Sequence, residues 1–353
     1  MPLNLQDLLH EMIKRDASDL HVTAYTPPQF RIDERLVPTE NPPLTPDDTR
    51  RMCYSMLNEE QIKKFEAEKE LDLSFGIEGL SRFRVNVFVQ RGCVGGAIRA
   101  IPFNIMSFEE CGLPVKVVSN ICKLPKGLIL VTGATGSGKS TTLASMIDSI
   151  NSQRHCHIVT VEDPIEYVHK NKKAIVDQRE VNSDTHSFAQ ALKHVLRQDP
   201  DVILIGEMRD LETIEAALVI AETGHLVFAT LHTSDCVQTI NRVIDVFPSH
   251  QQQQVRTQLS FVMMGVLSQQ LIPKIGKGRV LALEVLMVNP AVRSLVRESK
   301  VHQIYSVIQT SQKESMKTMN QALYELYINK TIALDEAMGR STNVEDLERL
   351  LRR

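Results

Sequence analysis

The residue types most able to do chemistry lie in one glycine-rich stretch, residues 133–141 (GATGSGKST). This stretch fits the phosphate-loop pattern G-x-x-x-x-G-K-[S/T] at every position. Glycines allow successive backbone N–H groups to converge on a phosphate, the lysine reaches the β- and γ-phosphates, and the hydroxyl after it ligates Mg²⁺. We therefore predict a nucleoside triphosphate site, with Mg²⁺ on Ser140 and with these nucleotide-binding residues: Gly133, Thr135, Gly136, Ser137, Gly138, Lys139, Ser140 and Thr141.

The segments on either side of the loop support this interpretation. Residues 127–132 form a short aliphatic run without charge, which is typical of a buried parallel strand. After the loop, apolar residues recur every three or four positions at Leu143, Met146, Ile147 and Ile150, which predicts a helix with one apolar face. A strand, a glycine loop and a helix in this order place the positive end of the helix at the bound phosphate.

Three further apolar runs are each followed by titratable side chains: 158–161 by Glu162 and Glu166, 202–205 by Glu207, and 226–230 by His232. Helical segments such as 187–198 lie between the runs, and strands that alternate with helices predict a parallel sheet. Ligands of such a sheet bind beyond the carboxyl ends of its strands. We therefore expect the phosphate loop, the acidic residues and the histidine to form one active site.

Hydrolysis requires a metal ion, an oriented water molecule and a cation near the transferred phosphoryl group. Glu207 follows an apolar strand and is predicted to hold the water shell of the metal. Both Glu166 and Glu207 are candidates for the catalytic carboxylate that positions and deprotonates water. His232 either contacts the γ-phosphate or is a hydrogen-bonded structural histidine. Arg84 and Arg197 are candidates for the cation, with Arg197 as an arginine finger, supplied within the chain or by a neighbouring subunit.

The rest of the chain divides into regions of different pattern. An amphipathic helix is predicted over residues 4–15, and a strand pair over 82–90 and 93–102. We expect a small α+β domain with an antiparallel sheet over 1–102, a linker over 103–125, and an α/β domain over 126–353 with a helical C-terminal part. Within that part we predict helices over 250–269 and 291–298, a strand over 280–286, and one charged amphipathic helix over 334–353.

Composition narrows the function classes. The chain has 353 residues, a length that predicts two domains. Of these residues 42% are hydrophobic and 24% are charged, which is usual for a soluble globular protein. Lys and Arg number 40 against 43 Asp and Glu, and this balance argues against a dedicated nucleic-acid binder. We expect no signal peptide and no transmembrane helix. The six cysteines form no C-x-x-C pair and are expected to be free thiols of a cytoplasmic protein, and residues 155–157 (HCH) lack a third metal ligand.

Several of these residues together resemble the motifs of the secretion/type IV pilus ATPase superfamily: residues 17–21 (ASDLH), the phosphate loop, 161–167 (VEDPIEY), 206–210 (GEMRD) and 221–233 (AETGHLVFATLHT). The resemblance covers essentially the whole chain and is strongest to the pilus-retraction branch. Residues 291–296 (AVRSLV) resemble the C-terminal motif of that branch, represented by Ala291, Arg293 and Leu295. Within this helix Val292, Leu295 and Val296 are expected to face inward, and Arg293 and Arg297 outward.

The resemblance implies a fold, an activity and partners. It implies a RecA-like P-loop ATPase domain after a PAS-like N-terminal domain, assembled as a homo-hexamer that uses ATP and Mg²⁺ to power type IV pilus retraction and twitching motility. It implies the inner-membrane pilus platform protein, the pilus machinery and an accessory retraction ATPase as partners, at the cytoplasmic side of the inner membrane at the pilus base. No nucleic acid is expected.

The resemblance also implies roles for individual residues. Glu166 becomes the catalytic carboxylate and Glu207 the carboxylate on the Mg²⁺ side. His225 and His232 join the nucleotide-responsive box, and arginines of strand 82–90, with Arg84 among them, approach the nucleotide. Three alternatives stay open: an accessory retraction ATPase, a RecA-like nucleic-acid motor, and a scaffold that binds ATP without hydrolysing it.

Overall fold

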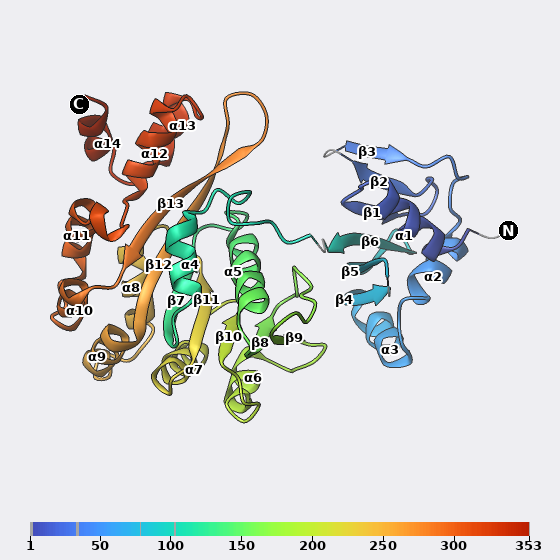
Figure 1. Cartoon of the computed structure of the whole chain (residues 1–353). Coiled ribbons are helices and arrows are strands. Elements are labelled where there is room, and N and C mark those ends of the chain that lie inside the picture. Colours follow the sequence, from blue (N-terminus) through green and yellow to red (C-terminus); the bar gives the residue numbers. More distant parts are fainter. Residues whose placement is uncertain (1–2, 33–34, 78, 102–103, 353) are drawn as a thin grey trace. The chain divides into compact units, whose positions relative to one another are not determined.

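The computed structural model describes residues 3–32, 35–77, 79–101 and 104–352, and it divides into two compact units (Figure 1). The first unit comprises Met1–Asn104 and Glu166–Val168, and the second comprises Ile105–Ile165 and His169–Arg353. The predicted domain boundary at 102 and 103 lies outside the described residues.

The first unit is an antiparallel sheet with helices packed on it. Its six strands have the order β3-β2-β1-β6-β5-β4, and every neighbouring pair is antiparallel. The strands are β1 (Asp19–Val22), β2 (Gln29–Ile32), β3 (Arg35–Pro38), β4 (Glu70–Ile77), β5 (Ser81–Gln90) and β6 (Cys93–Ile101), and the helices are α1 (Leu5–Lys14), α2 (Pro46–Tyr54) and α3 (Glu59–Glu68). The predicted pair, β5 and β6, is confirmed, because Phe83, Val85 and Val87 alternate into the core.

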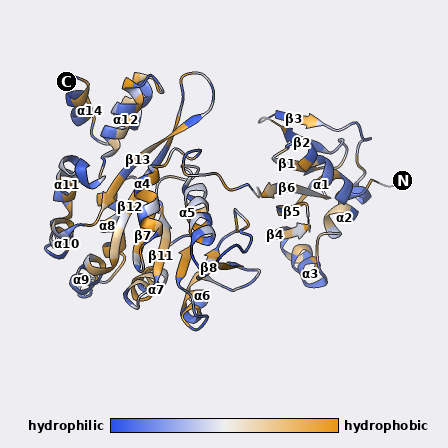
Figure 2. Ribbon diagram, viewed as in Figure 1, coloured by the Kyte–Doolittle hydropathy of each residue, from blue (hydrophilic) through white to orange (hydrophobic). Residues whose placement is uncertain are grey.

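The second unit contains the parallel sheet predicted from the sequence. Its seven strands have the order β13-β12-β7-β11-β10-β8-β9, and all neighbours are parallel except β12 and β13. The strands are β7 (Gly127–Thr132), β8 (His157–Glu162), β9 (Ile175–Glu180), β10 (Val202–Ile205), β11 (Leu226–Leu231), β12 (Met263–Pro273) and β13 (Arg279–Met287). The central strands are coloured mainly as hydrophobic in Figure 2.

Helices cover both faces of this sheet, so its strands have two apolar faces. Along β7, Leu128 and Leu130 belong to one core, and Ile129 and Val131 belong to the other. The first core is closed by α6 (Phe188–Val195), α7 (Leu211–Glu222), α8 (Cys236–Asp245), α9 (Gln252–Val262) and α10 (Pro290–Arg297). The second core is closed by α4 (Val115–Cys122) and α5 (Lys139–Gln153).

Three sequence-based expectations differ from the structure. The predicted linker contains α4, whose Val118 and Ile121 are fully buried in the second core. The helix predicted over 250–269 ends at Val262, because the chain then becomes extended and pairs with β7 and β13 on its two sides. The helix predicted over 334–353 is two helices, α13 (Leu334–Arg340) and α14 (Val344–Leu351), since Asn343 caps a new first turn by accepting a hydrogen bond from the Asp346 N–H.

A small third core carries the C-terminal helices. Residues of β12 and β13 pack there against α12 (Met319–Ile328), α13 and α14, while α11 (Ile304–Thr310) joins the first core. The Glu284 carboxylate on β13 accepts hydrogen bonds from the first N–H groups of two helices, that of Cys236 in α8 at 2.8 Å and that of Met319 in α12 at 3.1 Å. Burial raises the pKa of Glu284 despite these bonds.

All six cysteines are free thiols, as predicted. Within the described part of the chain, no helix combines the length and the apolar character that a membrane span requires.

A buried histidine makes the stability of the second unit depend on pH. His169 is 8% exposed, and burial lowers its pKa to about 4, from 6.5 in the unfolded chain. Between pH 6.5 and pH 4, His169 is therefore mostly protonated in the unfolded state and mostly neutral in the folded state. The free energy of unfolding falls as the pH falls through this range. Lowering the pH from 7 to 5 should cost about 2 kcal/mol of unfolding free energy through this residue.

We predict that His169→Gln removes this part of the acid sensitivity. Urea unfolding at pH 7 and pH 5 measures it, with the exposed His250→Gln as the matched control. The same loss of stability in His169→Gln as in the unmodified chain would contradict the assignment.

Candidate active site

The phosphate loop leaves β7 at the carboxyl edge of the sheet and has the conformation that a phosphate cradle requires. Gly133, Gly136 and Gly138 all have positive φ, at 141°, 78° and 90°. A Cβ on Gly133 would lie 2.4 Å from the carbonyl oxygen of Gln269, so only glycine fits this position. The Lys139 ammonium donates hydrogen bonds to the carbonyl oxygens of Gly133 (2.8 Å) and Ala134 (3.1 Å).

Two observations show that these residues fit a phosphate group. Helix α5 begins at Lys139 with Gly138 as its N-cap and has no side-chain cap, so no side chain competes for the positive end of the helix. The Ser137 hydroxyl, in a residue that is 6% exposed, has no hydrogen-bond partner among the described residues. A buried polar atom without a partner is costly, and closure of the loop on a bound phosphate would give this hydroxyl a partner.

Glu207 follows β10 at the same edge, and the side chains of Arg209 and His232 hold its carboxylate. The Arg209 guanidinium lies 2.7 Å from one carboxylate oxygen, and Nε2 of His232 lies 3.1 Å from the other. Burial alone would raise the pKa of Glu207, but the hydrogen bond from Arg209 and the charges of His232 and Arg209 outweigh it and lower the pKa. The carboxylate is therefore ionised at neutral pH, as a metal ligand must be.

Hydroxyl groups connect the loop after β11 to the end of β7. The hydroxyls of Thr233 and Thr239 lie 2.7 Å apart, and the Thr239 hydroxyl donates to Thr132, at 3.4 Å. Thr132 directly precedes Gly133 of the phosphate loop. On the other side of β11, the Thr230 hydroxyl donates to the carbonyl oxygen of Gly206, at 2.5 Å. These hydrogen bonds connect the ends of β7, β10 and β11. The phosphate loop, the loop with Glu207 and the loop with His232 begin at those three strand ends.

The acidic cluster after β8 separates into two parts. Glu162 ends the strand, and its carboxylate accepts hydrogen bonds from the side chains of Thr160 (2.6 Å) and Gln178 (3.1 Å), which indicates a structural role. Glu166 has an exposed side chain and belongs to the first unit. Its catalytic role stays a prediction.

Two predicted site residues lie away from the phosphate loop of their own chain. His225 directly precedes β11, and its carbonyl oxygen accepts a hydrogen bond from the N–H of Gly127, the first residue of β7. Because β7 runs from Gly127 to the loop, His225 lies at the opposite edge of the sheet, about 17 Å away at the usual rise per residue. The prediction that His225 binds nucleotide is therefore wrong for the loop of its own chain. Arg197 is exposed between α6 and the start of β10, at the same amino edge, and its role as an arginine finger stays a prediction.

Arg84 lies on the polar face of the sheet in the first unit. Its register partners on the neighbouring strands are Ser74 and Arg99, and the Arg99 guanidinium donates to Asp19 at 2.8 Å. Arg84 is exposed, and its nucleotide role stays a prediction.

The predicted retraction motif forms α10, but its arginine does not face outward. Val292 and Val296 are fully buried, as predicted, and Leu295 is partly buried. The Arg293 guanidinium donates to the carbonyl oxygens of Ser260 (2.7 Å) and Phe261 (2.9 Å) at the end of α9. It thereby satisfies helix carbonyls that have no partner within α9, and the expectation of a side chain free for a partner is wrong.

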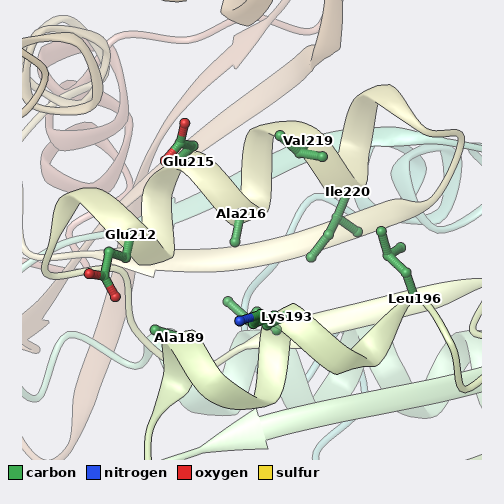
Figure 3. Close-up of a pocket in the computed structure, with 9 residues that line it drawn as sticks. Ala189, Lys193, Leu196, Glu212, Glu215, Ala216, Val219 and Ile220 are labelled. Carbon is green, nitrogen blue, oxygen red and sulfur yellow. The ribbon is translucent and has the colours of Figure 1, made fainter.

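A shallow groove of about 260 Å³ lies between α6 and α7 and contains none of the predicted site residues (Figure 3). Ala216 and Ile220 of α7 point toward α6 there, and Lys193, Glu212 and Glu215 are its charged members. It is separate from the phosphate loop.

Sequence reasoning missed three residues near the site. Arg209 stands within the same GEMRD motif as Glu207 and could have been named from it. Gln269 and Thr239 lie far from the loop in sequence; the only local signal for Gln269 is a polar pair in an otherwise apolar segment, 263–273 (MMGVLSQQLIP).

Known proteins share this architecture and sequence. Residues 2–338 match the family model described as "Type II/IV secretion system protein". The chain is 48% identical to the type IV pilus retraction ATPase PilT of Pseudomonas aeruginosa, over 96% of this chain and 98% of that protein. It is 40% identical to the type IV pilus ATPase PilU of the same organism, over 99% of this chain and 92% of that protein. A crystal structure of the pilus retraction motor PilT with bound ADP superposes with a TM-score of 0.92 at 53% identity, over 98% of this chain and 99% of that one.

We predict that Glu207→Gln lowers the kcat of ATP hydrolysis about 100-fold, because an amide brings no negative charge to a metal ion and forms no ion pair with Arg209. Steady-state phosphate release measures kcat. Glu212→Gln is the matched control, since that carboxylate is exposed and lies in the separate groove. Turnover within twofold of the unmodified chain would rule out the metal role of Glu207.

Proposed function

We propose that this chain, which belongs to the Type II/IV secretion system protein family, is an ATPase motor that powers type IV pilus retraction. The observation that carries the proposal is the match to PilT along nearly the full length of both chains, in sequence and in fold. The phosphate loop, with its positive-φ glycines and buried lysine, supplies the site that such an activity needs. The RecA-like P-loop fold expected from the sequence agrees with the same match.

Each residue of the phosphate site would have a different role in hydrolysis. The Lys139 ammonium, released from the carbonyl oxygens of Gly133 and Ala134, would pair with the β- and γ-phosphates. The Ser140 hydroxyl and the Glu207 carboxylate offer the oxygen ligands that Mg²⁺ prefers, and the ion would neutralise charge on the phosphates. His232 holds the Glu207 carboxylate in place and would respond to the γ-phosphate through that pair.

Glu166 is our candidate for the carboxylate that positions and deprotonates the attacking water. Two facts support it. The residues after β8 follow the order of the family motif, and Glu162, another carboxylate of this cluster, is already bonded to Thr160 and Gln178. A cation for the transition state would come from Arg84 or from Arg197, the latter from a neighbouring chain.

We further propose a homo-hexamer that acts at the cytoplasmic face of the inner membrane, on the pilus platform protein. The alternative of an accessory retraction ATPase is favoured less, because identity to PilU is 40% against 48% to PilT. A nucleic-acid motor is favoured less still, since the formal net charge is −3.

Complementation tests the proposal. Expressed in a Pseudomonas aeruginosa strain that lacks its own PilT, the chain should restore twitching zones, and Glu166→Gln should not, because it would fold and bind ATP without hydrolysing it. Immunoblotting controls for equal amounts. Twitching restored equally by both forms would exclude Glu166 as the catalytic carboxylate, and failure of the unmodified chain, with normal ATPase activity in vitro, would favour another load.

The same assay tests α10. Arg293→Ala should keep ATP hydrolysis within about twofold but lose twitching, because the end of α9 that it caps would be freed while the phosphate loop stays intact; loss of a helix cap costs about 1 kcal/mol. Arg297→Ala, on the same helix but stacked on the Phe261 ring at 5.9 Å, is the control. Loss of ATPase activity together with twitching in Arg293→Ala would mean that α10 serves only the fold.

A further inference from the structure

β12 extends past the end of β7 and runs beside the phosphate loop. The two parallel strands pair from Met263 and Leu128 to Ser268 and Thr132. Gln269, the next residue of β12, is therefore level with Gly133, the first residue of the loop. The close approach noted above, 2.4 Å between the Gln269 carbonyl oxygen and the position of a Cβ on Gly133, shows how tightly strand and loop pack.

The side chain of Gln269 is buried at this point, and only its amide nitrogen has a hydrogen-bond partner among the described residues. The residue is 1% exposed, and its Nε2 donates a hydrogen bond to the hydroxyl of Thr142 in α5, at 2.8 Å. Its Oε1 has no hydrogen-bond partner among the residues that the structure describes. A buried amide oxygen without a donor is destabilising by more than a typical hydrogen bond contributes, so a donor for this atom would be stabilising.

A complementary group belongs to the adjoining loop, the hydroxyl of Ser137. It too is buried without a partner in the described residues, and it lies 2.5 Å from the same Cβ position on Gly133 that the Gln269 carbonyl approaches. Ser137 can donate a hydrogen bond and Gln269 Oε1 can accept one. Both belong to segments that a bound phosphate would contact or adjoin.

We propose that Gln269 is a positioning residue for the phosphate loop. Its Nε2 holds α5 through Thr142, and its Oε1 accepts the hydrogen bond of the Ser137 hydroxyl when the loop closes on a phosphate group. The pairing would stabilise the closed loop and so increase nucleotide affinity, without contact between Gln269 and the nucleotide. This inference rests on the proposed nucleotide site.

β12 also contacts α10, the helix that forms the predicted retraction motif. Met264 lies at the other end of β12, where the register with β7 shifts. Its sulfur accepts a hydrogen bond from the Arg293 guanidinium at 3.6 Å. The same strand therefore contacts the phosphate loop at Gln269 and the retraction motif at Met264.

A double-mutant cycle on the full chain tests the proposal, with the dissociation constant of ADP in the presence of Mg²⁺ as the readout. One buried hydrogen bond corresponds to roughly a fivefold change in affinity. Gln269→Met, which keeps the size of the side chain, and Ser137→Ala should each weaken ADP binding about fivefold. The double variant should also lose about fivefold rather than about 25-fold, because the two residues lose the same bond.

Controls separate positioning from a role in folding alone. Gln270→Met alters the neighbouring residue, whose side chain donates to the Arg340 carbonyl oxygen at 3.3 Å, and should leave ADP affinity unchanged. Thr142→Val removes the other bond of Gln269 and should lower Tm by the same amount alone as in combination with Gln269→Met. Multiplicative losses of ADP affinity, or a lower Tm with unchanged affinity in Gln269→Met, would overturn the proposal.

The outcome is distinguishable from a failure of the proposed function. If the unmodified chain binds ADP but does not hydrolyse ATP, the motor function fails while the cycle still decides the role of Gln269. If the unmodified chain and Gln270→Met hydrolyse ATP normally and the cycle is multiplicative, only the inference about Gln269 fails.

Discussion

The nucleotide site depends on one buried strand. β7 is paired on both edges, by β12 and β11, and all six of its residues are buried. A slip of one residue would exchange the side chains that fill the two apolar cores, so close packing on both faces determines the register of β7. The point where the chain leaves the sheet, at Gly133, is determined with it. The glycines then have only to turn the backbone so that α5 starts with its positive end toward the loop.

Polar bonds across neighbouring strands hold the remaining site residues around that point. The Thr132, Thr239 and Thr233 hydroxyls tie the loop after β11 to the end of β7, and His232 from that loop pairs with Glu207 after β10. Glu284 extends the connection, because its buried carboxylate binds the first turns of both α8 and α12. A carboxylate that accepts hydrogen bonds at two helix N-termini is favourable there, and loss of either donor would leave one of its buried oxygens without a hydrogen bond. The C-terminal helices are therefore fastened to α8, the helix that follows the loop with His232.

The parts of the fold that could be predicted from sequence carry local signals. The loop pattern, the uncharged run before it and the runs ending in Glu207 and His232 each occupy a few adjacent residues. β12 could not be recognised, because its apolar residues suit a helix as well as a strand that is buried between two neighbours. The sequence could not show that His225 and the phosphate loop lie at opposite edges of the sheet, because a family motif records nearness in sequence, and a six-residue strand separates its two ends. The contacts of Arg293 with Ser260 and Phe261 span more than thirty positions, and no local pattern reveals them.

The central claim is that the loop after β7 binds and hydrolyses ATP. It is tested most directly by measuring ATP turnover and ADP binding of the purified full chain and of its Lys139→Ala form. The account predicts hydrolysis by the unmodified chain, and a loss of about 100-fold or more in turnover, with much weaker ADP binding, in Lys139→Ala. Equal turnover and equal ADP affinity in the two forms would contradict it.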